Sequence, residues 1–167
     1  NVMGSRGSVI PFFLKNAKSG ILTITDAKMT RFNITLLEAM ELVEWTLKHA
    51  RGGEVIVPKL PSYNIMDVAE AIGPNCEKKM VGIRIGEKLH EEMVTCADSQ
   101  YTYDVGKYFL IKPELTSDIS HNRYDGVNPN RVMDSFRYAS NTNDDFLKVN
   151  EIRDLIKANL DKNFKPL

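Results

Sequence analysis

The alternation of strand-like and helix-like segments is the feature that most restricts how this chain can fold. Runs of strand character at 29–34, 54–57 and 80–83 are separated by helical patterns at 35–50 and 64–72. The order strand, helix, strand, helix, strand is typical of α/β proteins. In such sheets ligands collect at the carboxyl ends of the strands, so we expect a binding site just after Ile83.

The helices in this pattern have start signals and apolar faces. Thr35 begins a capping-box sequence with Glu38 three residues later, and apolar residues repeat behind it at helical spacing. We expect this stripe and Trp45 to pack in a core; the stripe comprises Leu36, Met40, Val43 and Leu47. Asn64 is predicted to cap the second helix, and Asn150 to cap a final amphipathic helix.

The segment from Val81 to Met93 brings several charged side chains into one glycine-containing turn. Gly86 allows the backbone to turn tightly or to approach a ligand. Arg84 offers a planar fork of donors suited to phosphate oxygens, and Glu87 offers acceptors suited to sugar hydroxyls. Alternatively, Arg84 and Glu87 only pair with each other on a surface turn. The residues of this segment leave both interpretations open.

Two other arginines are candidates for anion binding. Arg6 lies in the Gly-Ser-Arg-Gly-Ser turn at 4–8, where backbone N–H groups can surround an anion, although such turns usually only connect elements. Arg31 lies among apolar neighbours, where it is either a paired structural residue or a ligand contact. His90 lies beside two glutamates, but no second histidine lies at ligand spacing, so we predict no metal site.

Charge and apolar content limit the partners of the chain. Lysine plus arginine and aspartate plus glutamate both number 22, so no excess positive charge attracts nucleic acid or an anionic membrane. No apolar run approaches the roughly 20 residues that a membrane span requires. Cys76 and Cys96 have neither metal-type spacing nor a disulfide framework. We interpret them as reduced thiols of a cytoplasmic protein.

Four strings, in the same order, resemble the UDP-N-acetylglucosamine 4,6-dehydratases of bacterial surface-sugar biosynthesis. They lie at 1–13, 29–35, 53–61 and 82–93. The first reads Asn-Val-x-Gly-Ser-Arg-Gly-Ser-Val-x-Pro-Phe-Phe, and the last contains Gly-Ile-Arg-x-Gly-Glu-Lys-Leu-His-Glu. The last string is most similar to the inverting branch, which also epimerises the sugar and supplies pseudaminic acid synthesis. Ile85 stands where members of the family often have proline.

The resemblance implies a fold, a cofactor and a set of contacts. These dehydratases are extended short-chain dehydrogenases, which have a Rossmann-like α/β fold, use NADP and act on UDP-N-acetylglucosamine. Val2 would touch the nicotinamide cofactor. The intact protein is expected to be a cytoplasmic lyase and a homo-oligomer. Carried over residue by residue, the substrate-binding side chains would be those of Asn1, Arg6, Arg31, Arg84 and Glu87.

Two features of the short-chain dehydrogenases are missing from the pattern. We find no glycine-rich dinucleotide fingerprint, and we predict that the chain has no Tyr-x-x-x-Lys pair at the spacing of one helical turn. We therefore expect the carboxyl-terminal, substrate-binding half of such an enzyme, without most of the nucleotide-binding sheet and without dehydratase activity of its own. Its parts are predicted to be a substrate-binding portion at 1–115, a polar loop or flap at 116–145, and a helix and tail at 146–167. We expect the flap to be poorly ordered without ligand or partner subunit.

Two alternative functions remain open at this point. The strings are shared in part by retaining and capsule-type UDP-sugar 4,6-dehydratases of the same superfamily. The second alternative is that the chain is a non-catalytic module, which binds sugar nucleotides or serves in assembly.

Overall fold

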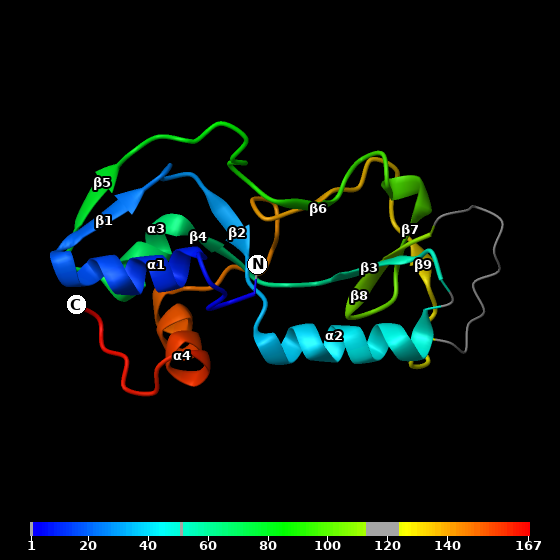
Figure 1. Cartoon of the computed structure of the whole chain (residues 1–167). Helices are drawn as coiled ribbons and strands as arrows, with labels where there is room; N and C mark the ends of the chain where they lie inside the picture. The colour runs from blue at the N-terminus through cyan, green and yellow to red at the C-terminus, as the bar shows by residue number, and fades with distance from the viewer. Residues whose placement is uncertain (1, 51, 113–123) are drawn as a thin grey trace. The chain divides into compact units, whose positions relative to one another are not determined.

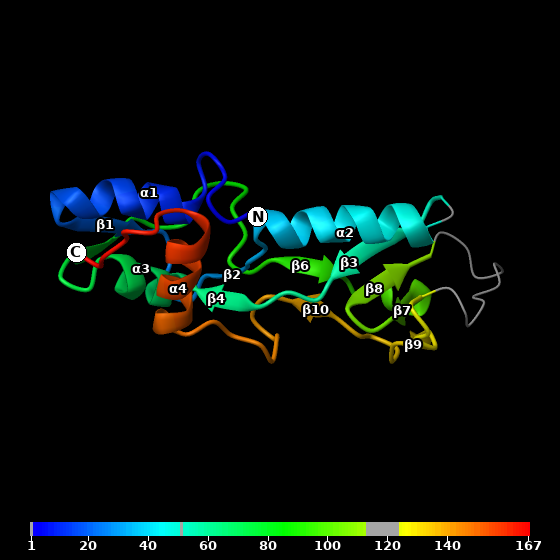
Figure 2. The same cartoon turned by 90° about the horizontal axis from the view of Figure 1, so that it is seen from below.

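The computed structural model describes residues 2–50, 52–112 and 124–167, and the chain forms two compact units (Figures 1 and 2). The first unit comprises residues 1–36, 60–91 and 140–167, and the second comprises residues 37–59 and 92–139. Each unit has its own cluster of buried apolar side chains. Both units combine helices with strands, so the predicted α/β class is confirmed.

The first unit contains two short sheets and three α-helices. Its elements are α1 (Val9–Asn16), a 3₁₀ turn (Ala17–Ser19), β1 (Ile21–Ile24), β2 (Thr30–Phe32), β4 (Ser62–Asn64), α3 (Ile65–Ile72), β5 (Glu77–Met80) and α4 (Val149–Asn159). β1 pairs in parallel with β5, and β2 pairs antiparallel with β4. The three helices gather on one side of the β1–β5 pair (Figure 1).

Apolar side chains from all three helices form the core of this unit. Phe13 of α1, Val68 of α3 and Ile156 of α4 are each almost completely buried. Asn64 caps α3 as predicted, because its side-chain oxygen accepts a hydrogen bond of 2.8 Å from the backbone N–H of Met66. The predicted cap at Asn150 is wrong. α4 already begins at Val149, so Asn150 lies within its first turn.

The second unit is built on one antiparallel sheet and one long helix. Its elements are α2 (Leu36–His49), which begins at the unit boundary, β3 (Val55–Pro58), β6 (Glu92–Val94), a 3₁₀ turn (Ser99–Tyr101), β7 (Thr102–Asp104), β8 (Tyr108–Ile111), β9 (Asn130–Arg131) and β10 (Tyr138–Ala139). The sheet has the order β3-β8-β7-β9, and β6 pairs separately with β10. α2 lies along this sheet (Figures 1 and 2), with Trp45 against Tyr108 at 4.5 Å between ring centroids.

Two predictions about these elements are wrong. The strand expected at 80–83 is β5, which ends at Met80 because Gly82 adopts a left-handed φ of 84° that an extended strand cannot continue through. The expected core-facing stripe of α2 is not buried. Its residues are 58% to 81% exposed, and the opposite face of the helix packs on the sheet instead. The stripe comprises Leu36, Met40, Val43 and Leu47.

The predicted flap at 116–145 extends beyond what the structure describes. Residues 113–123 lie outside the described residues, and the rest of the segment contributes the short strands β9 and β10. Tyr124 and Tyr138 are buried in the second unit. The predicted ranges 1–115, 116–145 and 146–167, and the order of the flap, remain predictions.

Candidate functional site

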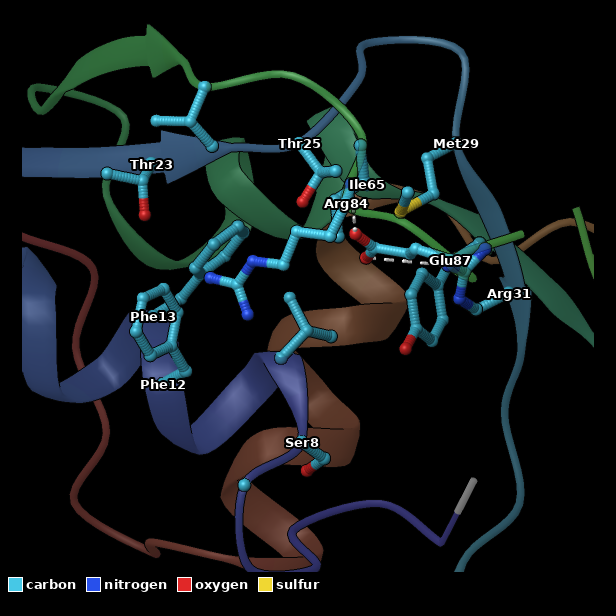
Figure 3. Close-up of a pocket in the computed structure, with 14 residues that line it drawn as sticks. Ser8, Phe12, Phe13, Thr23, Thr25, Met29, Arg31, Ile65, Arg84 and Glu87 are labelled. Carbon is cyan, nitrogen blue, oxygen red and sulfur yellow. Dashed lines mark hydrogen bonds and ion pairs between the residues drawn. The ribbon is translucent and has the colours of Figure 1, made fainter. Parts of the chain in front are cut away.

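A pocket of about 310 Å³ opens in the first unit and contains the charged turn singled out in the sequence (Figure 3). The start of α1, the strands β1, β2 and β4, and the segment after β5 all contribute to its wall. Both polar and apolar side chains line it. The lining residues are Gly7, Ser8, Val9, Phe12, Phe13, Thr23, Thr25, Met29, Arg31, Tyr63, Ile65, Val81, Arg84 and Glu87.

The amino-terminal end of α1 forms one side of this pocket. The turn before it is closed by the Ser8 hydroxyl, which donates a hydrogen bond of 2.7 Å to the Ser5 carbonyl. Gly7 has a left-handed φ of 80° and leaves open space beside its Cα atom. The first N–H groups of a helix have no partner within the helix, and its dipole favours negative charge there. This side of the pocket is therefore suited to an anion.

The segment after β5 returns across the pocket as a closed turn. The Val81 N–H donates a hydrogen bond of 2.8 Å to the Ile24 carbonyl, which extends the β1–β5 pairing by one residue. At the far end the Glu87 N–H donates to the Arg84 carbonyl at 3.0 Å, and the Arg84 N–H donates to the Glu87 carboxylate at 3.3 Å. Gly86 occupies the left-handed position of this turn, with φ 83°.

Arg31 ties this turn to β2. Its Nη1 donates to the carbonyls of Thr30 and Leu89 at 2.7 and 3.0 Å, and its Nη2 donates to the Lys88 carbonyl at 2.7 Å. The guanidinium also lies 3.9 Å from the carboxylates of Glu87 and Glu91. Most donors of this side chain are therefore directed at the protein, and they fix the course of the chain from 87 to 91.

A buried polar network supports the same segment from behind. The Thr30 hydroxyl lies 2.8 Å from His90 Nδ1 and 2.7 Å from the Ser140 hydroxyl. The Ser140 oxygen accepts a hydrogen bond of 2.9 Å from the Glu91 N–H, while the Glu91 carboxylate accepts one of 2.8 Å from the Phe32 N–H. β2, the turn and the start of the 140–167 segment are thus held together by hydrogen bonds in which each group has a partner.

Arg84 differs from Arg31 in the surroundings of its guanidinium. Its side chain extends over the pocket toward Phe12 and Phe13 (Figure 3). Within residues 2–50, 52–112 and 124–167, that guanidinium makes no hydrogen bond or ion pair with the protein. The expected alternative, a simple side-chain pair between Arg84 and Glu87, is not what forms, because Glu87 meets Arg31 and the Arg84 backbone instead.

Several pocket residues were not singled out from the sequence. Tyr63 is almost fully buried, and burial, followed by the nearby Glu91 carboxylate, raises the pKa of its phenol well above the usual value for tyrosine. It therefore stays neutral and can serve as a hydrogen-bond donor at physiological pH. Thr23 and Thr25 line the pocket from β1 and its end. Their alternation along a strand is the only sequence signal that could have indicated this.

The structure brings together three of the six residues predicted to contact substrate or cofactor. Arg31, Arg84 and Glu87 all line the pocket. Arg6 is exposed in the turn before α1 and is not one of the residues that line the pocket. Val2 is half-buried and bridges to Ile34, while Asn1 lies outside the described residues.

The prediction that the chain has no Tyr-x-x-x-Lys pair is wrong, because this spacing occurs in Tyr103–Lys107 and Tyr108–Lys112. The structure shows why neither is a helical pair. Tyr103 lies in β7 and Tyr108 in β8, and each lysine follows in a turn or after the strand. Residues four apart adjoin on one face of a helix, whereas in an extended chain they lie roughly 13 Å apart.

Other chemistry-bearing groups are dispersed in the part of the chain that the structure describes. No three His, Cys, Asp or Glu side chains there are grouped so as to hold a metal ion. Cys76 is a buried free thiol and Cys96 an exposed one. No described helix has the length and apolar character to cross a membrane.

The sequence profile of one family, described as polysaccharide biosynthesis protein, matches residues 1–113, and the chain belongs to this family. The UDP-N-acetylglucosamine 4,6-dehydratase (inverting) of Campylobacter jejuni subsp. jejuni serotype O:23/36 (strain 81-176) is 42% identical to it over 163 residues. That match covers 93% of this chain and 48% of the relative. The resemblance to such dehydratases is thereby confirmed.

More distant relatives have other activities. The UDP-glucose 4-epimerase of Rickettsia canadensis (strain McKiel) is 35% identical over 161 residues, which is 93% of this chain and 47% of that protein. The X-ray structure of Pen from Bacillus thuringiensis superposes with a TM-score of 0.80 at 32% identity, over 95% of this chain and 48% of that one. The chain thus spans about half the length of these relatives.

Proposed function

We propose that this pocket binds the UDP part of UDP-N-acetylglucosamine, and that the chain is the substrate-binding portion of an inverting 4,6-dehydratase in bacterial surface-sugar biosynthesis. The support comes from two directions. The pocket combines an apolar wall, a helix amino terminus and two arginines, which suits a nucleoside attached to a diphosphate. Relatives with that printed activity match nearly the whole chain.

The single observation that carries the proposal is the guanidinium of Arg84. It reaches into the pocket and, in the described part of the chain, has no protein partner. A charged group held without a partner beside a cavity is suited to a ligand of opposite charge. The turn that carries it is closed by Gly86 and tied down through Arg31. The cation is therefore presented by an ordered backbone, which lowers the entropy lost on binding.

The remaining predicted contacts take supporting roles in this proposal. Glu87 offers its carboxylate to sugar or ribose hydroxyls, and Arg31 lines the pocket while it holds the turn. Arg6 would approach the substrate from the turn before α1, and Asn1 is assigned to the substrate by the family resemblance alone. These assignments follow the family resemblance and the position of each residue along the chain.

NADP is the cofactor implied by the resemblance. When bound, it would take up and return the hydride while the protein orients the sugar. Among the described residues only Val2 is proposed to touch it, so this chain holds little of the cofactor. We propose accordingly that the 167-residue chain has no turnover by itself, and that the intact enzyme is a cytoplasmic homo-oligomer that supplies pseudaminic acid synthesis.

A second candidate is favoured by the Rickettsia relatives, whose printed activity is UDP-glucose 4-epimerase. Both activities require a site for UDP, so Arg84 has the same role in either. They differ in the sugar. Isothermal titration with UDP-N-acetylglucosamine and UDP-glucose separates them, since the dehydratase proposal requires the N-acetylated sugar to bind more tightly.

Titration of the purified chain with UDP and with uridine tests the pocket itself. If the diphosphate is held by Arg84 and the start of α1, UDP binds roughly 30-fold or more tightly than uridine. Equal affinity for the two, or no binding of either, contradicts a diphosphate site in this chain.

A further inference from the structure

The hydroxyl of Tyr63 lies at the wall of the pocket without a hydrogen-bond partner from the protein. Only 4% of the residue is exposed, yet it is one of the residues that line the pocket. Among the residues that the structure describes, its hydroxyl makes no hydrogen bond. No completely buried side-chain oxygen or nitrogen in this part of the chain lacks such a partner. The Tyr63 oxygen is therefore not enclosed in the core, and it reaches the open space of the pocket.

The pairing of two strands fixes the position of this side chain. β2 and β4 are antiparallel, and Tyr63 lies directly opposite Arg31 in their register. Residues that face each other in such a pair project to the same side of the sheet. Arg31 is held by backbone carbonyls, and Tyr63 belongs to the core cluster of the first unit. The hydroxyl is thus held in place before a ligand enters, which reduces the entropy lost on binding.

The hydroxyl is a neutral donor. Burial, followed by the nearby Glu91 carboxylate, raises the pKa of Tyr63, and the opposing effect of the Arg31 charge is smaller. The phenol therefore keeps its proton at physiological pH. Such a group donates one hydrogen bond to an oxygen acceptor and adds no charge to the site. A buried donor without a protein partner is costly unless a ligand or water accepts its hydrogen bond.

The charges of the pocket differ between its two sides. Near Tyr63, the carboxylates of Glu87 and Glu91 lie 3.9 Å from the single guanidinium of Arg31, so negative charge is in excess there. Figure 3 shows the guanidinium of Arg84 directed away from Arg31 and Glu87, over the start of α1. A helix amino terminus and an arginine attract phosphate, whereas paired carboxylates repel it. The Tyr63 side is accordingly suited to the uncharged part of a nucleotide.

We propose that Tyr63 contacts the ligand of this pocket, and that its hydroxyl donates a hydrogen bond to an oxygen of the nucleoside. The inference rests on the proposed function, because it takes the ligand to be a uridine diphosphate. It adds the direction in which that ligand lies. The nucleoside is placed beside β2 and β4, and the diphosphate beside Arg84 and the start of α1.

Tyr63→Phe tests this contact because it removes one oxygen and keeps the ring. The hydroxyl has no hydrogen bond to the described part of the chain, so the variant should melt at nearly the native temperature. Tyr108→Phe is the matched control. Tyr108 is a buried tyrosine of the second unit whose pKa is also raised by burial, and it does not line the pocket.

Three ligands locate the contact on the purified chain. UDP is titrated by calorimetry, and uridine and inorganic pyrophosphate are titrated by NMR. Tyr63→Phe should weaken UDP and uridine by the same factor, about 5- to 30-fold, and leave pyrophosphate unchanged. Arg84→Ala should give the reverse pattern, with UDP and pyrophosphate weakened and uridine unchanged. Tyr108→Phe should bind all three ligands as the native chain does.

Four results would overturn the inference, and they separate it from the proposed function. Native affinity of Tyr63→Phe for UDP and uridine would show that the hydroxyl contacts no ligand, while the UDP site itself would stand. A loss confined to UDP and pyrophosphate would place the diphosphate beside β4. A melting temperature far below that of Tyr108→Phe would make Tyr63 a structural residue. If the native chain binds neither UDP nor uridine, the proposed function fails and the role of Tyr63 fails with it.

Discussion

Arg31 and Glu87 form an ion pair across the pocket wall, with 3.9 Å between Nη2 and Oε1, while Arg84 on the same turn leaves its guanidinium directed into the pocket. The two arginines are therefore not equivalent. Arg31 is largely occupied by the protein, through three backbone carbonyls and two carboxylates. Arg84 is available for a ligand because Arg31 holds the turn that carries it.

Arg31→Ala should loosen the turn and lower stability. Removing the guanidinium leaves the carbonyls of Lys88 and Leu89 without these partners, and we expect the free energy of unfolding to fall by about 2–4 kcal/mol. Arg31→Lys should recover little, since one ammonium cannot reach carbonyls arranged for a planar fork. Urea unfolding measures the stability, and hydrogen exchange of residues 84–91 reports the turn. Arg6→Ala, at an exposed position, is the control. If Arg31→Ala leaves hydrogen exchange at residues 84–91 unchanged, the claim that Arg31 holds this turn is contradicted.

Ser140→Ala should destabilise the first unit although Ser140 lies far along the chain from the turn it supports. The buried Ser140 hydroxyl forms a hydrogen bond with the Thr30 hydroxyl and accepts one from the Glu91 N–H. Its loss leaves buried polar groups without these partners, at a cost of about 1–3 kcal/mol. Ser19→Ala removes an exposed hydroxyl bonded to the Asn16 carbonyl and should cost much less. Thermal melting of both variants decides the matter, and equal melting temperatures would show that the network contributes nothing.

The sequence predicts most local structure of this chain because the signals are local. The Asn64 cap and the turn around Gly86 depend on neighbours within a few residues. The apolar stripe of α2 was misjudged for the opposite reason. Helical spacing identifies apolar faces, but α2 has two of them, and spacing alone does not say which one this chain covers.

The site was predictable only in part, for the same reason. Arg84 and Glu87 were found because they share one short turn. The hydrogen bond from Arg31 to the Leu89 carbonyl joins residues 58 positions apart, and the Thr30–Ser140 hydrogen bond joins residues 110 positions apart. The spacing of residues within one helix or strand contains no information about such long-range pairs. Tyr63 was missed because a tyrosine between two predicted elements resembles any packing residue until its pocket is seen.

Acid should weaken the second unit through Asp98. The Thr95 hydroxyl and N–H donate to its carboxylate at 2.6 and 2.9 Å and hold the pKa of Asp98 below its ordinary value. A depressed pKa contributes stability above the pKa of an unfolded aspartate, about 3.9, and that stability is lost as the pH falls through the lower folded value. Asp98→Asn should therefore be less stable than the native chain at pH 7, with a smaller difference at pH 3. A constant difference in urea unfolding at the two pH values would refute this assignment.

The most direct test of the account is the affinity of Arg84 variants for UDP, measured by isothermal titration beside their melting temperatures. Since the guanidinium makes no hydrogen bond or ion pair with the described part of the chain, Arg84→Ala should leave the melting temperature nearly unchanged. It should weaken UDP binding by roughly 30- to 1,000-fold, with Arg84→Lys restoring only a small part. Uridine binding should be almost unaffected in both. Unchanged UDP affinity together with a large loss of stability would show that Arg84 is a structural residue and that this pocket does not hold the diphosphate.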